Sequence, residues 1–264
     1  MPLCIAGMHR SGTSMIASAL HACGLDLGPK KDFLPPDPNN PEGFWESRSF
    51  LRLNDAILKG RGGSWDHPPR RDVAGWENEP SLDPACHKAS KLVRNFQGRE
   101  PWGWKDPRNC LTLSWWRKLL PDMKVLICVR NPLAVAKSLW LRNEISYADS
   151  FELWLTYNRR VLSAAPLERR LVTHCETYLR DPQGELRRVL QWAGLAATED
   201  RMKLAYRRIA PSLMHHHMTL TDLVDAGASA DLLRCYRDLC EEAGLGESAE
   251  LAGDVSAARS ATLI

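Results

Sequence analysis

The chain has 264 residues, of which 44% are hydrophobic and 25% charged, and this is enough for one sizeable globular domain. Its net charge of +3 is too small to predict binding to nucleic acid or to a membrane surface, and no apolar run reaches the length of a membrane span. An apolar strand already begins at residue 3, so we expect no signal peptide and a cytoplasmic protein. The eight cysteines are scattered without a Cys-x-x-Cys pair, which favours reduced thiols.

Strand and helix patterns alternate along the chain. Apolar strand candidates lie at residues 3–6, 102–105, 124–129 and 171–175. Helical patterns lie at residues 14–23, 46–58, 84–96, 111–120, 132–142, 151–164 and 182–193. The order predicts an α/β fold, in which one domain (residues 1–245) has a central parallel sheet flanked by helices, and residues 246–264 form a flexible tail.

A glycine loop, GMHRSGTS, joins the first predicted strand to the first predicted helix. Gly7 and Gly12 have the spacing of a Walker A loop, but Thr13 stands where that loop has lysine, and Arg10 precedes the second glycine. Backbone N–H groups of such a loop form an anion site with the first helical turn. The loop therefore predicts a phosphorylated ligand handled without the usual lysine, unless it is only a strand-to-helix turn.

A second charged position follows the strand at 124–129, which ends in Arg130 rather than in a metal-binding aspartate. Asn131 is a predicted N-cap and Pro132 a first helical residue, so the helix N-terminus and Arg130 should face the same crevice as the glycine loop. Taken alone, Arg130 could also be a surface cation.

The sequence resembles the sulfotransferases that use 3′-phosphoadenosine 5′-phosphosulfate (PAPS). Arg10-Ser11-Gly12-Thr13-Ser14 is similar to the family's 5′-phosphosulfate loop, (K/R)SGT(T/S). KVLICVRNPLAVAKS is similar to its 3′-phosphate element, which has an arginine and, eight positions later, a serine. GWKDPR and HCETYLRDPQGELRRVLQWAGL also look like family segments. The four motifs occur in the family's order and cover residues 3–195.

This resemblance implies a P-loop-like fold, PAPS as the donor, 3′,5′-ADP as the product and no metal. The 5′-phosphosulfate would be bound by Arg10, Ser11, Gly12, Thr13 and Ser14. The 3′-phosphate would be bound by Arg130 and Ser138, and Lys105 would stabilise the leaving group. The alternative for Lys105 is a surface ion pair with Asp106.

The resemblance points to Glu46, in NPEGFWES, as the general base, because related bacterial enzymes have a glutamate in a similar stretch. The histidine that cytosolic relatives carry one or two places after the strand lysine is absent, since Asp106 and Pro107 stand there. Asp106 is thus the rival base. Glu46 could instead begin the helix at 46–58 as a capping residue.

The acceptor is less defined by the sequence. Segments 29–46 and 60–83 are rich in Pro, Gly and Trp, and their tryptophans could stack on an acceptor such as a sugar or could be core residues. Cys175-Glu176-Thr177 replaces the Tyr-Glu-Asp of many relatives, which leaves the adenine contacts open, and no C-terminal Arg-Lys-Gly loop is present. We therefore expect a bacterial-type enzyme that acts on a carbohydrate or small metabolite.

Three further points stay open. His215, His216 and His217 could cover the donor or the acceptor, or could bind a metal. A P-loop kinase and a noncatalytic nucleotide-binding module are the competing functions. The sequence gives no oligomeric state.

Overall fold

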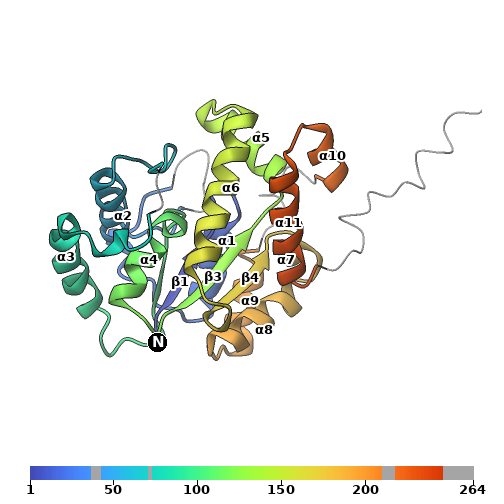
Figure 1. The fold of residues 1–264 in the computed structure, drawn as a ribbon. Coiled ribbons are helices and arrows are strands. Elements are labelled where there is room, and N and C mark those ends of the chain that lie inside the picture. The colour runs from blue at the N-terminus through green and yellow to red at the C-terminus, as the bar shows by residue number, and fades with distance from the viewer. Residues whose placement is uncertain (37–42, 71–72, 210–217, 246–264) are drawn as a thin grey trace, which may run out of the picture.

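The computed structural model describes residues 1–36, 43–70, 73–209 and 218–245, and these form helices around a central parallel sheet (Figure 1). The strands of this described part lie in the order β2-β1-β3-β4. They span Leu3–Ala6 (β1), Gly103–Lys105 (β2), Lys124–Val129 (β3) and Arg170–His174 (β4). All four agree with the predicted strands to within one residue at each end.

The position of β1 creates the crevice of the fold. Ile5 of β1 pairs with Lys105 of β2 on one side and with Leu126 of β3 on the other. From β1 the chain therefore crosses to one neighbour, and from β3 it crosses to the opposite edge. Loops that leave adjacent parallel strands in opposite directions leave a crevice at the carboxyl edge of the sheet, and ligands bind there in open α/β folds.

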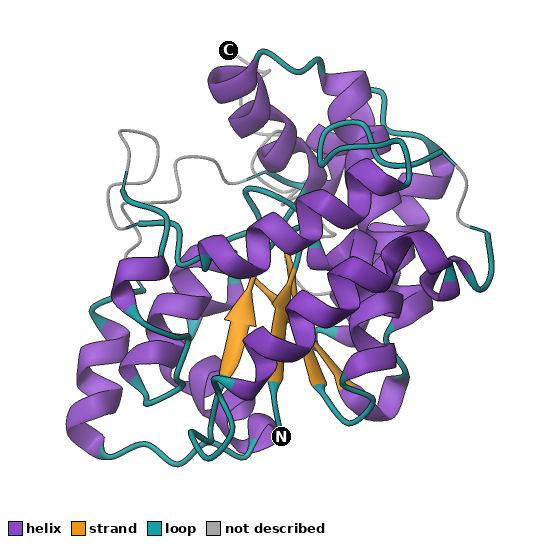
Figure 2. Cartoon of the chain, turned by 90° about the vertical axis from the view of Figure 1, so that its left-hand side faces the viewer, coloured by secondary structure: helices purple, strands orange, loops and turns teal. Residues whose placement is uncertain are grey.

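Residues of β1 and β3 alternate between two apolar cores. Cys4 and Ala6 of β1 belong to the larger core, whereas Leu3 and Ile5 belong to the smaller one on the opposite face. A parallel sheet that is buried on both faces needs apolar residues on both, which explains the uninterrupted apolar run of this strand. Figure 2 shows helices on both sides of the strands.

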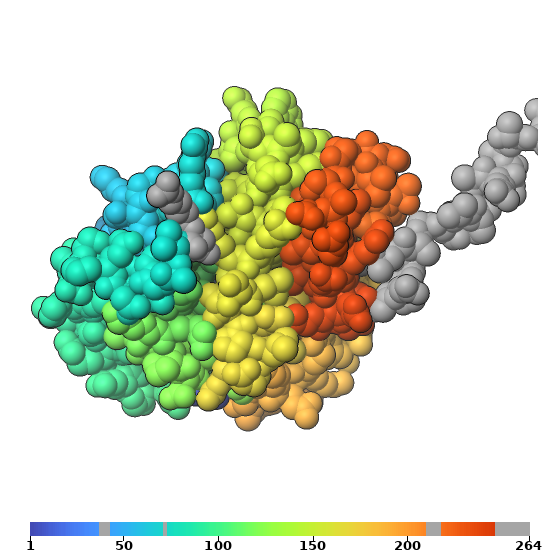
Figure 3. Space-filling model, viewed as in Figure 1, coloured from blue at the N-terminus to red at the C-terminus, as the bar shows by residue number. Residues whose placement is uncertain are grey.

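Helices cover the two faces unequally. The larger core includes residues of α2 (Arg48–Gly60), α3 (Asp83–Arg94), α4 (Asn109–Leu119), α5 (Pro132–Asn143), α6 (Tyr147–Ala164), α10 (Leu220–Asp225) and α11 (Ala230–Glu242). The smaller core includes residues of α1 (Thr13–Ala22), α7 (Thr177–Arg180), α8 (Pro182–Ala193) and α9 (Glu199–Tyr206). In the space-filling view α6, in yellow, crosses the middle of one face (Figure 3).

Polar side chains cap the first turns of α5 and α8. The Asn131 side chain accepts a 2.9 Å hydrogen bond from the backbone N–H of Leu133 at the start of α5. Asp181 accepts a 2.8 Å bond from the N–H of Gly184 at the start of α8. This helix ends at Ala193 and is followed by Gly194, which has φ 74°. Both helices have proline as their first residue, and the caps fix where each one leaves the sheet edge.

The C-terminal part differs from the prediction. No helix was predicted after residue 193, whereas α9, α10 and α11 are present. In α11 the buried Leu232, Tyr236 and Leu239 follow helical spacing, and the helix packs on α6 and β4. Residues 246–264 and His215 to His217 lie outside the described residues. In the described part, no helix is long and apolar enough to cross a membrane.

Candidate active site

The glycine loop after β1 turns sharply at two glycines. Gly7 has φ 147°, and Gly12, which directly precedes α1, has a left-handed φ of 79°. A Cβ atom at Gly12 would collide with Sγ of Cys175, and one at Gly7 would collide with the backbone oxygen of Cys128. Both positions therefore require glycine, for conformation and for space. The first-turn N–H groups of α1 lack intrahelical partners and face this edge of the sheet.

Arg10 and Ser138 meet although 128 residues separate them. Arg10 donates a 2.7 Å hydrogen bond from Nε to Oγ of Ser138 on α5, and Arg130 donates a 3.2 Å bond from Nη1 to the backbone oxygen of Arg10. These contacts bring the predicted 5′ and 3′ elements together at adjacent strand ends. The predicted juxtaposition of Arg10 and Arg130 is confirmed.

Arg130 is a buried cation, with 7% of its surface exposed. Its Nε atom has no hydrogen-bond partner among the described residues, and no carboxylate of those residues forms an ion pair with it. Burying an unpaired charge is unfavourable, so such a side chain suits a site that receives an anion. The prediction that allowed Arg130 to be a surface cation is wrong.

Lys105 lies at the end of β2 and is fully enclosed. Its Nζ atom donates to Oε1 of Glu46 at 2.6 Å and to Oγ of Ser14 at 3.1 Å, and Ser14 in turn donates to the backbone oxygen of Phe44 at 3.1 Å. The Lys105 and Glu46 side chains are 1% and 7% exposed. The alternative of a surface pair between Lys105 and Asp106 is therefore wrong.

Glu46 is not the cap of the helix that follows it. Ser47 caps α2, because its Oγ accepts a 3.3 Å bond from the N–H of Phe50. Oε2 of Glu46 is buried without a hydrogen-bond partner among the described residues. Burial raises the pKa of the Glu46 carboxyl above its ordinary value, although the ammonium of Lys105 acts in the opposite direction. The carboxylate is thus free on one oxygen and more basic than an exposed glutamate.

Asp106 is occupied by contacts that hold the fold. Its Oδ2 accepts a 2.9 Å bond from Nδ2 of Asn54, and its Oδ1 accepts bonds from the backbone N–H and from Nη1 of Arg108, at 2.9 and 3.1 Å. The Asp106 residue has no exposed surface. A fully buried carboxylate with both oxygens already hydrogen-bonded is a poor candidate for taking a proton from a substrate.

Asn54 of α2 connects this carboxylate to α4. Besides Asp106, its Nδ2 donates to Oδ1 of Asn109 at 3.0 Å. Its Oδ1 accepts from Oγ1 of Thr112 at 2.8 Å and from Nε1 of Trp116 at 2.7 Å. All four hydrogen-bonding positions of the amide are filled, and the bonds fix the start of α4 against α2.

The remaining loop hydroxyls are placed differently from one another. Ser11 is buried, and its Oγ has no hydrogen-bond partner among the described residues. Thr13 begins α1 and is also buried, whereas Ser14 is engaged with Lys105. The unsatisfied hydroxyl of Ser11 is therefore available to a ligand that enters the loop.

The tryptophans of the two irregular segments have different neighbours. Trp45 packs on the rings of His21 and Phe33, and Trp76 is buried beneath Arg61. Trp65 lies against His9 of the glycine loop, with ring centroids 4.5 Å apart. Trp45 and Trp65 are both partly buried, and they pack against the smaller and the larger core, respectively.

Comparison with known families assigns the chain to a protein family. A model described as the sulfotransferase family matches residues 2–200. The chain belongs to the sulfotransferase family. The matched sulfotransferase region contains the glycine loop, Glu46, Lys105, Arg130 and Ser138. No curated protein gives a significant match.

Two solved sulfotransferase domains have a similar fold. The domain of the olefin synthase of Synechococcus PCC 7002 matches with a TM-score of 0.53 and 18% identity, covering 90% of this chain and 94% of that one. The domain from the curacin biosynthetic pathway matches with a TM-score of 0.54 and 14% identity, covering 90% and 98%. At this identity the likeness shows the fold, and the predicted α/β sulfotransferase fold is confirmed.

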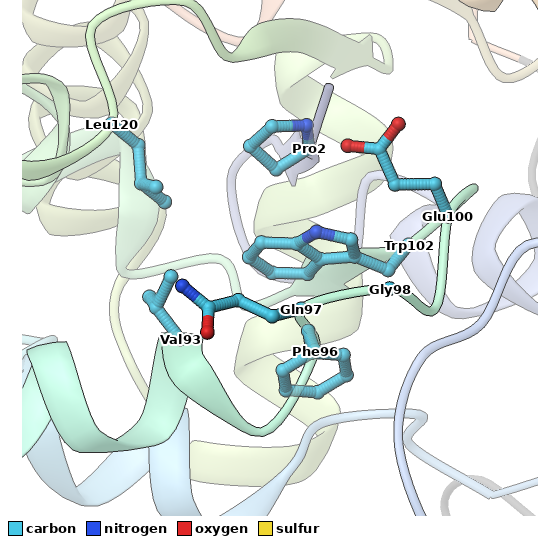
Figure 4. A pocket seen from close by; sticks show the side chains of 8 residues that line it. All are labelled: Pro2, Val93, Phe96, Gln97, Gly98, Glu100, Trp102 and Leu120. Carbon is cyan, nitrogen blue, oxygen red and sulfur yellow. The ribbon is translucent and has the colours of Figure 1, made fainter.

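A groove of about 510 Å³ lies at the other edge of the sulfotransferase sheet (Figure 4). Its lining includes Pro2 before β1, Trp102 before β2, and Phe96. These residues stand at the amino ends of the strands, away from the glycine loop, so the groove is not part of the candidate site. In the described residues, no group of His, Cys, Asp or Glu side chains is arranged to hold a metal.

One residue of the site was given no role by sequence reasoning. His9 stands in the loop beside Arg10, and its neighbours Trp65 and Tyr157 come from distant segments. The family motif begins at Arg10, so it does not include this histidine. Its position in the loop was the available signal.

Proposed function

We propose that the chain transfers a sulfuryl group from PAPS to an acceptor hydroxyl. The observation that carries the proposal is the meeting of Arg10, Lys105 and Arg130 at the carboxyl edge, where Arg10 and Lys105 contact serine hydroxyls and Arg130 contacts the backbone oxygen of Arg10. Buried and partly buried cations beside helix N-termini attract an anion with several charged groups. PAPS has such groups at both ends of its ribose.

Two ends of the donor correspond to two groups of residues. The 5′-phosphosulfate would be bound by the loop N–H groups with Arg10, Ser11, Gly12, Thr13 and Ser14. The 3′-phosphate would be bound by Arg130 and Ser138. The support is that one hydrogen bond, from Arg10 to Ser138, already spans the two groups, so a single small nucleotide can contact both.

The transfer is an in-line displacement at sulfur. The acceptor oxygen attacks the sulfur while the bond from sulfur to the 5′-phosphate oxygen breaks, and the electron pair stays on that oxygen, giving 3′,5′-ADP. Lys105 would stabilise the developing negative charge. Glu46 would accept the hydroxyl proton, and its raised pKa and unpaired Oε2 support this role over Asp106.

For the acceptor we propose a carbohydrate or a small metabolite. Trp65 lies beside His9 of the loop, and Phe44, two residues before the proposed base, has the guanidinium of Arg142 5.2 Å from its ring centroid. Such surfaces suit the apolar face of a sugar or a ring. A cytoplasmic location belongs to the same proposal, because all eight cysteines are free.

Calorimetric titration tests the donor directly. In buffer with a metal chelator, 3′,5′-ADP should bind and AMP should bind more weakly. In a second buffer that contains Mg²⁺ and no chelator, ATP should have little affinity. Preference for ATP with Mg²⁺ would instead indicate a kinase. Labelled PAPS, offered with carbohydrate, phenol and peptide acceptors, then tests transfer. Binding of 3′,5′-ADP without transfer to any of them would favour a noncatalytic module.

A further inference from the structure

The side chains of His9 and Arg10, adjacent in the glycine loop, contact different parts of the molecule. Arg10 has a left-handed φ of 70°, which turns the chain between the two side chains. Arg10 reaches Ser138 on α5, whereas the His9 ring lies against Trp65 and against Tyr157 of α6, with centroids 4.5 and 5.9 Å away. The loop thus presents two different groups to two sides of the space it encloses.

Trp65 and Tyr157 pack against the His9 ring but give its Nε2 atom no hydrogen bond. Tyr157 donates its hydroxyl to the backbone oxygen of Trp65 at 2.7 Å, so this hydroxyl is already engaged. Nε2 of His9 is buried and has no hydrogen-bond partner among the described residues. A buried polar atom without a partner is uncommon in folded proteins, and in a ligand-binding loop it marks a contact that the ligand completes.

The surroundings of His9 are cationic. Burial holds the pKa of His9 well below its ordinary value, and nearby positive charges lower it further; these belong to Arg108, Lys105, Arg142 and Arg10, in decreasing order of effect. The ring is therefore neutral at physiological pH and suited to hydrogen bonding rather than to proton transfer. An anion placed among these cations is the natural partner of an imidazole N–H.

The proposed donor has one group that fits this place. Its 5′-phosphate is assigned to the loop N–H groups and its 3′-phosphate to Arg130, which leaves the sulfuryl group beside Lys105. We propose, building on the proposed function, that Nε2 of His9 donates a hydrogen bond to a non-bridging oxygen of this sulfuryl group. His9 thereby recognises the loaded donor and holds sulfur in line with the acceptor.

The consequence is discrimination between PAPS and 3′,5′-ADP, which lacks the sulfuryl group, and it can be measured without an acceptor. In calorimetry, His9→Phe keeps a ring between Trp65 and Tyr157 and should weaken PAPS binding about 10-fold to 100-fold, with 3′,5′-ADP binding changed less than about twofold. His9→Gln keeps an N–H donor near the position of Nε2 and should retain PAPS affinity within about threefold.

A second measurement uses the unaltered protein. With ¹⁵N-labelled histidine, the Nε2 signal of His9 should shift on adding PAPS and should stay in place on adding 3′,5′-ADP. Equal weakening of both ligands in His9→Phe, or unchanged PAPS affinity, would overturn the inference, as would an unmoved signal. If the wild-type protein binds 3′,5′-ADP and transfers label from PAPS, the proposed function stands even when this inference falls; if it binds neither nucleotide, both fall.

Discussion

The amino and carboxyl edges of the sheet differ in chemistry. At the amino edge, the groove of Figure 4 is lined by Phe96, Trp102 and Leu120, and its acidic residue Glu100 is paired with the N-terminal amine. At the carboxyl edge, the buried Arg130 and Ser11 have polar atoms without partners among the described residues. The comparison thus separates a groove whose charged residue already has a partner from a cluster of buried polar groups that could still bind an anion.

The largest expected effect comes from placing a side chain at Gly12. Gly12→Val should abolish binding of 3′,5′-ADP in calorimetry, because the new side chain meets Sγ of Cys175 and the left-handed backbone disfavours valine. Gly98→Val at the amino edge is the matched control, since Gly98 has φ 74° and nothing within 4 Å of its Cβ position. This control should change affinity less than about twofold. Full affinity in folded Gly12→Val would remove the loop from the donor site.

The next effect concerns chemistry. Glu46→Gln should slow transfer to an acceptor found by the PAPS screen about 100-fold, because the amide cannot take the proton. It should also lower the stability by about 1 to 3 kcal/mol in thermal unfolding, because the buried Lys105 loses its counter-charge. Asp106→Asn should slow transfer far less; the opposite order would make Asp106 the base.

The buried pair of Glu46 and Lys105 also predicts a pH dependence. Since burial raises the pKa of Glu46 above 4.5, transfer should be lost as the pH falls through this raised value, and Glu46→Gln should remove that limb of the rate profile. For stability the sign is opposite. A raised carboxyl pKa favours the protonated folded state, so this contribution is present at low pH and disappears as the pH rises through the folded pKa.

A smaller effect concerns the 3′-phosphate. Arg130→Ala should weaken 3′,5′-ADP binding by tens-fold, because charge-assisted bonds at a buried site are strong, and should affect AMP much less. Arg99→Ala is its counterpart near the amino edge, where Arg99 is paired with Asp26 at 2.7 Å. It should leave both ligands unaffected. Equal losses for AMP and 3′,5′-ADP in Arg130→Ala would assign this arginine to the fold or to another phosphate.

The smallest effect is expected at the amino-edge groove itself. Gln97 is exposed on its rim, so Gln97→Arg should fill part of the groove and change the unfolding free energy by less than about 0.5 kcal/mol. Donor affinity and transfer rate should equal those of the wild-type protein. A clear loss of transfer would show that the groove holds a substrate.

Local patterns predicted the elements that carry the proposed donor site. The apolar run before Gly7, the glycine spacing and Asn131 with Pro132 each act within a few residues, so strand, loop and capped helix are readable from the sequence. The parallel sheet was also predicted, with Arg10 and Arg130 at its carboxyl edge. The strand order itself was not predicted, because it depends on contacts between distant segments.

The contacts that set the charge state of the site were not predictable in this way. Lys105 pairs with Glu46, 59 residues away, rather than with adjacent Asp106, because the packing of α2 decides which carboxylate reaches the buried ammonium. Likewise, the sequence does not distinguish Trp65 from Trp45, since both lie in irregular segments. The helical spacing of α11 was present in the sequence and was overlooked.

The amide of Asn54 has a consequence for which substitutions the chain tolerates. Aspartate has nearly the same shape as asparagine. In Asn54→Asp, however, a carboxylate oxygen would replace Nδ2 and would face Oδ2 of Asp106 and the side-chain Oδ1 of Asn109, and it could donate a hydrogen bond to neither. The most conservative replacement by shape would therefore be among the most disruptive. Because α2 begins two residues after Glu46, the Asn54 bonds hold the helix next to the proposed base through an uncharged, fully buried side chain.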